Sequence, residues 1–162
     1  DAEGERGPTW LDIDFTEAQG DYDERMEAVA AVLGRYLQPL PSGSVVAEFG
    51  SRYGDLARLV AQRNPNVKVQ PTEGAGETLG VFLLLQERVL KHNEELARVC
   101  GPDGPRLLAP RYIDSSKLEG WTDQLKGPNV HCLFAVDVLH FLPADGIEGL
   151  LHGCRRGPRA GG

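Results

Sequence analysis

The sequence predicts an α/β fold in which helices cover both faces of a mostly parallel sheet. Short apolar runs alternate with longer segments whose apolar residues recur at helical spacing. At residues 45–64, an apolar run passes through a turn with two glycines into an amphipathic segment. Because strands that alternate with helices pair in parallel, this order favours one α/β domain for the 162 residues.

Turns rich in proline or glycine separate the predicted elements, as at 39–43 and 101–105. Pro110 leaves the third strand open between two ranges. The nearly all-apolar run 130–136 predicts a strand that is buried on both faces. The elements are, in order, a helix over 22–38, a strand over 45–49, a helix over 55–64, a strand over 67–70, a helix over 77–99, a strand at 106–109 or 112–113, a possible short helix within 115–128, a strand over 130–136 and a helix from Pro143.

The negative charge of the chain is concentrated near its N-terminus. Residues 1–27 carry ten acidic and two basic side chains, whereas the whole chain has a net charge of −7, so the remainder is about neutral. We expect residues 1–21 to form an acidic N-terminal arm that is either disordered or docked onto a partner, and its short apolar patch around Trp10 favours docking. No basic stripe with interleaved aromatic residues is visible, which disfavours nucleic acid as a partner.

The cysteine pattern indicates a reducing compartment, either the cytoplasm or an organelle interior. Cys100, Cys132 and Cys154 are odd in number and have no C-x-x-C spacing, which argues against a disulfide framework and against a zinc site. No apolar run approaches the length of a membrane span, so the chain is not expected to be an integral membrane protein.

The segment 45–54 is the most informative of the chain. Its apolar run ends in Glu48, and Gly50 and Gly54 follow two and six positions later. This is the layout of a nucleotide-binding strand–turn–helix unit, in which glycines allow close approach of a ligand. Glu73 comes 19 residues after Gly54, near the spacing of about 20 expected for an acidic residue that binds ribose.

These motifs resemble the class I S-adenosylmethionine-dependent methyltransferases, and among them the small methyltransferase-like family of unknown function DUF938. Residues 45–54 are similar to the glycine-rich first motif of that family. Residues 69–73 (Val-Gln-Pro-Thr-Glu) are similar to its Trp-Gln-Pro-Ser-Asp segment, and residues 136–143 to its Asn-Met-Leu-His-Ile-Met-Pro segment. Glu24-Arg25 and residues 32–37 are similar to its first helix.

The resemblance implies a Rossmann-like three-layer sandwich. Its sheet would be truncated and mostly parallel, with about four strands in the order 3-2-1-4. The methyltransferase-like domain would cover residues 22–162 and lack the C-terminal strands, because the chain ends after a turn-like segment at 157–162. A fragment or a misread gene model would explain this ending equally well.

The resemblance also assigns roles to individual residues, and S-adenosylmethionine is the implied cofactor, unless the site has lost it. Glu73 would bind the ribose hydroxyls, and Asp114 would lie beside the adenine amine. On the catalytic side, Asp137 stands where the family has asparagine, and His140 is the candidate general base. The residues that would line the methionine part of the cofactor are Glu48, Gly50, Ser51 and Gly54.

Each candidate also has a plain structural interpretation. Glu48 could cap a turn through the amides around Ser51, and Glu73 could be a solvated loop acid. Asp114 could cap a helix, and His140 could be a hydrogen-bonded packing residue. Arg52 departs from the family pattern, because it replaces the glycine that lets the backbone touch the ligand, and its side chain either points outward or fills the pocket.

Two functions follow from these observations. The first is a catalytically degenerate, methyltransferase-like subunit of a larger protein assembly, favoured by Arg52, the missing strands and the acidic arm. The alternative is an active S-adenosylmethionine-dependent methyltransferase acting on a small molecule or a protein. Methyl transfer needs no catalytic triad, because the sulfonium is already activated.

Overall fold

The sheet of this protein has four parallel strands in the order β3-β2-β1-β4. The computed structural model describes residues 15–74, 79–113, 125, 130–138, 142 and 144–156. β1 (Ser44–Phe49) lies at the centre of the sheet between β2 (Val67–Glu73) and β4 (Val130–Ala135), and β3 (Arg111–Tyr112) pairs with the end of β2. The predicted fold class and strand order are confirmed.

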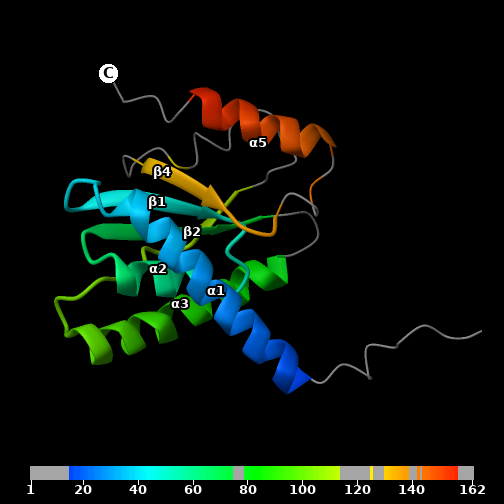
Figure 1. Ribbon diagram of the computed structural model, residues 1–162. Helices are drawn as coiled ribbons and strands as arrows, with labels where there is room; N and C mark the ends of the chain where they lie inside the picture. Colours follow the sequence, from blue (N-terminus) through cyan, green and yellow to red (C-terminus); the bar gives the residue numbers. More distant parts are fainter. Residues whose placement is uncertain are drawn as a thin grey trace, which may run out of the picture.

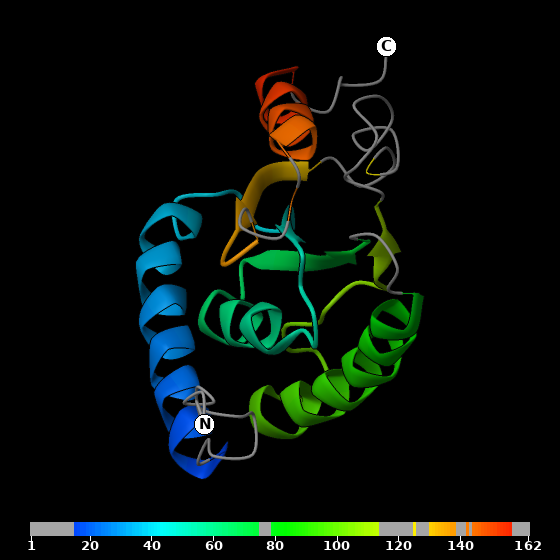
Figure 2. The same ribbon diagram turned by 90° about the vertical axis from the view of Figure 1, so that its right-hand side faces the viewer.

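Helices cover both faces of this sheet. α1 (Phe15–Leu37), α2 (Asp55–Arg63) and α3 (Leu79–Cys100) lie on one side, and α5 (Ala144–Arg156) lies on the other (Figure 1). The view turned by 90° shows α2 between α1 and α3 beneath the sheet (Figure 2). The result is a three-layer sandwich of helix, sheet and helix.

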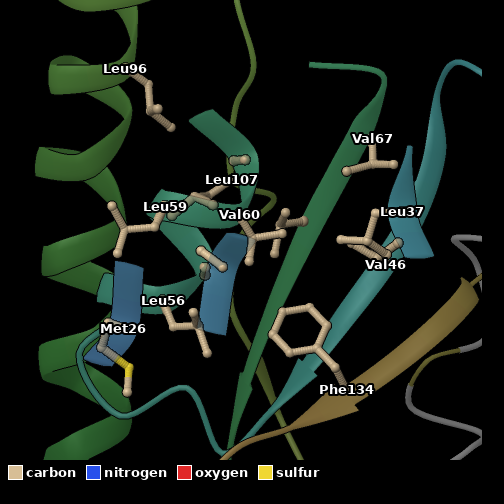
Figure 3. Close-up of a cluster of buried hydrophobic side chains, with 14 of the residues drawn as sticks. Met26, Leu37, Val46, Leu56, Leu59, Val60, Val67, Leu96, Leu107 and Phe134 are labelled. Atoms are coloured by element: carbon tan, nitrogen blue, oxygen red, sulfur yellow. The ribbon is translucent and has the colours of Figure 1, made fainter. Parts of the chain in front are cut away.

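The alternating side chains of β1 serve two separate cores. Val46 belongs to the larger core, which lies between the sheet and α1, α2 and α3 (Figure 3). Ala47 and Phe49 point the other way and join Leu150 of α5 in the second core. Because side chains alternate along a strand, Glu48 points to the same side as Val46, toward α2.

Three elements differ in extent from their predicted ranges. α1 begins at Phe15, so its helix runs through residues 15–21 of the predicted arm without a break. β2 continues past Pro71 to Glu73, because its pairing with β1 extends to Thr72 opposite Phe49. Both ranges proposed for the third strand contact β2, through β3 itself and through an isolated bridge between Leu107 and Val69.

The prediction that the fourth strand is buried on both faces is wrong for the described residues. Phe134 is the one fully buried side chain of β4, and His131 and Ala135 are exposed. The physical reason is the position of β4 at an edge of the sheet, where one side of the strand has no neighbouring strand in the described ranges. His131 has a structural contact: the Val45 amide donates to its Nδ1 at 3.3 Å, where the ladder between β1 and β4 shifts register.

Candidate functional site

A tight loop at residues 50–54 joins the carboxyl end of β1 to α2. Gly50 and Gly54 adopt positive φ angles of 75° and 79°, and Arg52 has a φ of 50°. The Gly54 amide donates to the Ser51 carbonyl oxygen at 2.7 Å, which closes the turn directly before α2 begins at Asp55. Positive φ is inexpensive for glycine but costs an L-residue roughly 1–2 kcal/mol, so Arg52 is held there by its surroundings.

The first half of this loop is attached to β2. Ser51 donates its amide to the Thr72 carbonyl at 2.8 Å, and the Thr72 amide donates to the Ser51 hydroxyl at 3.1 Å. The Thr72 hydroxyl in turn donates to the Glu48 carbonyl at 2.7 Å. These buried hydrogen bonds give Ser51 and Thr72 a structural role that the sequence pattern did not indicate.

Glu48 is a buried carboxylate at the end of the central strand. Its side chain is 4% exposed, and its Oε2 atom has no hydrogen-bond partner within the described residues. Burial raises the pKa of Glu48 to about 7, with smaller contributions from the nearby charges of Glu73 and Asp55. Hydrogen bonding from Ser51 and from the Ala57 backbone in the first turn of α2 opposes this rise. The backbone amides of Ser51 and Arg52 go to Thr72 and Glu73, so Glu48 does not cap the turn through them, and its Oε2 has no partner within the described residues.

Glu73 lies at the end of β2, beside the same loop. Its Oε2 accepts the Arg52 amide at 2.7 Å and its Oε1 accepts the Gly74 amide at 3.1 Å. The side chain is 6% exposed, so the interpretation of Glu73 as a solvated loop acid is wrong. The neighbouring position 74 requires glycine, because a Cβ there would lie 2.0 Å from the Ile113 carbonyl oxygen.

The side chain of Arg52 points outward and does not fill the space beside the loop. The residue is exposed, and its guanidinium carbon lies 5.9 Å from the centre of the Tyr53 ring. Of the two orientations considered from the sequence, the structure shows the outward one. The backbone amide of Arg52, which binds Glu73, is the part of the residue that belongs to the site.

Both loop glycines are packed against side chains of the protein itself. A Cβ at Gly50 would lie 2.6 Å from Cγ2 of Val138, and a Cβ at Gly54 would lie 3.2 Å from Cδ1 of Leu85. Val138 packs so closely against position 50 that any residue larger than glycine would clash with it.

Of the two candidate catalytic residues, the structure describes Asp137. Asp137 follows β4 with a φ of 55° and forms a 2.8 Å ion pair with Arg25 of α1. Both side chains of this pair are about half exposed. Arg25 also lies 5.9 Å from the centre of the Tyr22 ring on the same helix, and its ion pair with Asp137 connects α1 to the segment after β4. His140 and the predicted adenine-binding residue Asp114 lie outside the described residues.

Sequence reasoning missed His92, which lies on α3 and faces the loop. Its side chain is 4% exposed and its Nε2 lies 3.1 Å from the Tyr53 carbonyl oxygen. The signal available in the sequence was its position in the buried stripe of α3, which contains Leu85, Val89, His92 and Leu96 at helical spacing. A histidine in such a stripe needs a polar partner, and the partner comes from another element.

Other kinds of site find no support in the part of the chain that the structure describes. No group of three or more His, Cys, Asp or Glu side chains there is arranged to hold a metal ion. No helix in these ranges has both the length and the apolar character that crossing a bilayer requires.

Comparison with known proteins finds similarity to solved structures only. No family model matches the chain, and neither does any curated protein. The resemblance to the DUF938 family therefore has no support from these comparisons. The chain is similar to a SAM-dependent methyltransferase from Geobacter sulfurreducens in complex with S-adenosyl-L-homocysteine, with 15% identity and a TM-score of 0.45. The match covers 80% of this chain and 43% of that chain, so this chain spans less than half of the length of that methyltransferase.

Proposed function

We propose that the carboxyl edge of this sheet binds a positively charged adenosyl compound, with S-adenosylmethionine as the candidate. The observation that carries the proposal is the buried Oε2 atom of Glu48, which has no hydrogen-bond partner among the described residues. A buried acceptor without a partner costs roughly 1–3 kcal/mol. The amino group of S-adenosylmethionine would supply a cationic donor and remove this cost.

Glu73 fits the ribose of the same ligand. Each oxygen of an ionised carboxylate accepts about two hydrogen bonds, and each oxygen of Glu73 already accepts one backbone amide. The remaining lone pairs suit two vicinal hydroxyl groups without loss of either amide contact. The loop residues Gly50, Ser51 and Gly54 would face the methionine part through their backbone, and Asp114 remains the candidate for the adenine amine.

We further propose that the domain is catalytically degenerate and serves as an accessory or structural subunit of a larger protein assembly. The candidate catalytic carboxylate of Asp137 has a cationic partner of its own, Arg25, at 2.8 Å. This contact engages the carboxylate of Asp137 with a side chain of the protein itself, which makes it less available to a substrate. The outer edge of β4, unpaired within the described ranges, supports the same proposal, because an exposed strand edge is a ready template for a partner.

An active methyltransferase is the second candidate, and the free oxygen of Glu48 favours it. A chain that had lost its cofactor would have no need for a buried acceptor without a partner. The methyl acceptor, a small molecule or a protein, would then lie near His140 and Asp137.

Titration calorimetry with S-adenosylmethionine and S-adenosyl-L-homocysteine tests the binding proposal. We expect micromolar binding by the wild-type chain, and a Glu48→Gln variant that binds about tenfold more weakly because it lacks the anionic contact. Absence of binding by the wild-type chain would refute the cofactor proposal. Transfer of a labelled methyl group to components of a cell extract, abolished by Asp137→Ala, would refute the accessory role and establish the enzyme.

A further inference from the structure

His92 of α3 donates a hydrogen bond to the loop that carries the candidate site. Its Nε2 atom lies 3.1 Å from the Tyr53 carbonyl oxygen and 3.5 Å from Oδ1 of Asp55. A carbonyl oxygen can only accept a hydrogen bond, so Nε2 must carry the proton. The imidazole therefore acts as a fixed donor beneath the second half of the loop.

The peptide group between Tyr53 and Gly54 is held at both of its ends. Its carbonyl oxygen accepts from His92, and its N–H group donates to the Ser51 carbonyl at 2.7 Å. Gly54 itself offers little steric resistance to rotation, because glycine populates many backbone conformations. Its φ of 79° is therefore set by the contacts that hold this peptide group, one within the loop and one from α3.

α3 supplies these contacts through packing as well as through the hydrogen bond. The position that a Cβ of Gly54 would take lies 3.2 Å from Cδ1 of Leu85 and 3.5 Å from Cδ2 of His92. The first half of the loop is attached to β2 through Ser51 and through the Arg52 amide. The loop is thus fixed by β2 on one side and by α3 on the other.

The other nitrogen of the ring faces a small group of charges. Nδ1 is buried without a hydrogen-bond partner in the described ranges and lies 3.8 Å from Oε2 of Glu95, on the same helix. Glu95 is 3.8 Å from Nε of Arg58 on α2. Asp55 and Glu95 are the charged groups beside the His92 ring, and Arg58 contacts Glu95. The Tyr53 carbonyl oxygen, at 3.1 Å, is closer to Nε2 than Oδ1 of Asp55, at 3.5 Å.

We propose that His92 is a positioning residue of the adenosyl site, which holds the Tyr53–Gly54 peptide in the orientation that ligand binding requires. The Arg52 amide then meets Glu73, and the Ala57 backbone in the first turn of α2 meets Glu48 at the end of β1. The effect on ligand affinity rests on the proposed function, whereas the effect on the loop can be measured without any ligand.

A matched pair of amide variants tests this proposal. In His92→Gln the side-chain amide nitrogen can reach the place of Nε2, whereas in His92→Asn it lies near the place of Nδ1 and falls short of Tyr53. We expect His92→Gln to keep the wild-type amide exchange rates at Gly54 and Asp55 and to bind S-adenosyl-L-homocysteine within about twofold of the wild-type chain. His92→Asn should exchange faster at these amides and bind about fivefold to tenfold more weakly, the effect of one lost hydrogen bond.

Equal behaviour of the two variants in exchange and in affinity would overturn the proposal, because a donor that reaches the Tyr53 carbonyl would then make no difference. A Glu95→Gln variant serves as a control and should leave both measurements unchanged; a change as large as that of His92→Asn would assign the effect to the charges and overturn the proposal. If His92→Asn does not fold, the ring nitrogen chemical shifts of the wild-type chain decide the question, since a proton on Nδ1 in place of Nε2 contradicts it. If the wild-type chain binds no ligand, the proposed function fails, and the exchange rates still decide the role of His92.

Discussion

The backbone amide of Arg52 donates a 2.7 Å hydrogen bond to Oε2 of Glu73, and this contact ties the loop after β1 to the end of β2. The other oxygen of the same carboxylate accepts the amide of Gly74. One side chain thus sets the relative position of two loops at the carboxyl edge of the sheet, where open α/β sheets bind their ligands.

Replacing Glu73 by glutamine should destabilise the protein and loosen both loops. The amide NH₂ of glutamine cannot accept a hydrogen bond, so one of the two backbone donors loses its partner, at a cost of about 1–3 kcal/mol. Urea denaturation measures this loss, with Glu94→Gln as a control on the exposed face of α3. We expect the control to change the free energy of unfolding by less than about 0.5 kcal/mol. Equal stability of the two variants would contradict the structural role of Glu73.

The raised pKa of Glu48 predicts that its contribution to stability falls with increasing pH. In the unfolded chain the carboxyl group releases its proton near its ordinary value of 4.5, whereas in the folded protein it holds the proton until about pH 7. The stabilisation is therefore complete below pH 4.5 and is lost progressively until about pH 7. At about 1.36 kcal/mol per pH unit, the total is on the order of 3 kcal/mol.

The comparison that isolates this effect is the difference in free energy of unfolding between the wild-type chain and Glu48→Gln, measured by urea denaturation from pH 4.5 to 7.5. Glutamine keeps the shape of the neutral acid and does not titrate. The difference should shift in favour of the glutamine variant as the pH rises through this interval. A difference that is constant with pH would show that Glu48 titrates alike in both states.

Arg52→Gly should relieve backbone strain without changing ligand affinity. The guanidinium group is exposed and lies over the Tyr53 ring, so its removal opens no pocket. Because the φ of Arg52 is 50°, we expect the glycine variant to be about 1 kcal/mol more stable than Arg52→Ala, which retains the Cβ. Thermal denaturation of the two variants measures this difference. Ligand binding that appears only in Arg52→Gly would show that the side chain does obstruct the site.

Gly50→Ala and Gly43→Ala form a pair that separates strain from steric overlap. Both glycines have positive φ, 75° and 83°, but a Cβ at Gly43 meets no atom within 4 Å, whereas one at Gly50 would lie 2.6 Å from Val138. We expect Gly43→Ala to cost roughly 1 kcal/mol. Gly50→Ala should cost about 1–3 kcal/mol more, because overpacking adds to the strain.

A double-mutant cycle with Val138→Ala checks the cause of the larger loss at Gly50. Shortening Val138 removes the methyl groups that a Cβ at position 50 would meet. The two substitutions together should therefore cost less than the sum of the single substitutions, by about 1 kcal/mol. Strict additivity would mean that the backbone conformation alone excludes alanine.

Much of the architecture could be predicted because its signals are local. The apolar run before Glu48, the two glycines and the amphipathic segment after them specify a strand, a turn and a helix, and the structure contains them within one residue of the predicted bounds. The glycine requirement at positions 50 and 54 was also visible. The sequence did not indicate that Val138 and Leu85 pack against these glycines, since both lie more than 30 residues away.

The candidate site was predicted only in part, because hydrogen bonds between distant residues leave no pattern in a single sequence. Glu48 and Glu73 were identified by their place after apolar runs, but the engagement of both Glu73 oxygens by backbone amides required the two loops to be placed side by side. The ion pair between Arg25 and Asp137 likewise joins residues that are distant along the chain. His92 was missed because a helical apolar stripe shows which face of the helix is buried and does not show which atoms the buried side chains contact.

The amino-acid sequence alone determined that parallel strands alternate with helices. It also determined that the first strand ends near an acidic residue and is followed by a glycine turn, because periodicity and turn chemistry act over a few residues. Within the described residues, the tertiary structure decided that β4 lies at an edge of the sheet, that Arg52 points away from the site, and that one oxygen of the buried Glu48 has no hydrogen-bond partner. These properties depend on burial and on contacts between segments that meet only when the sheet and its helices pack together.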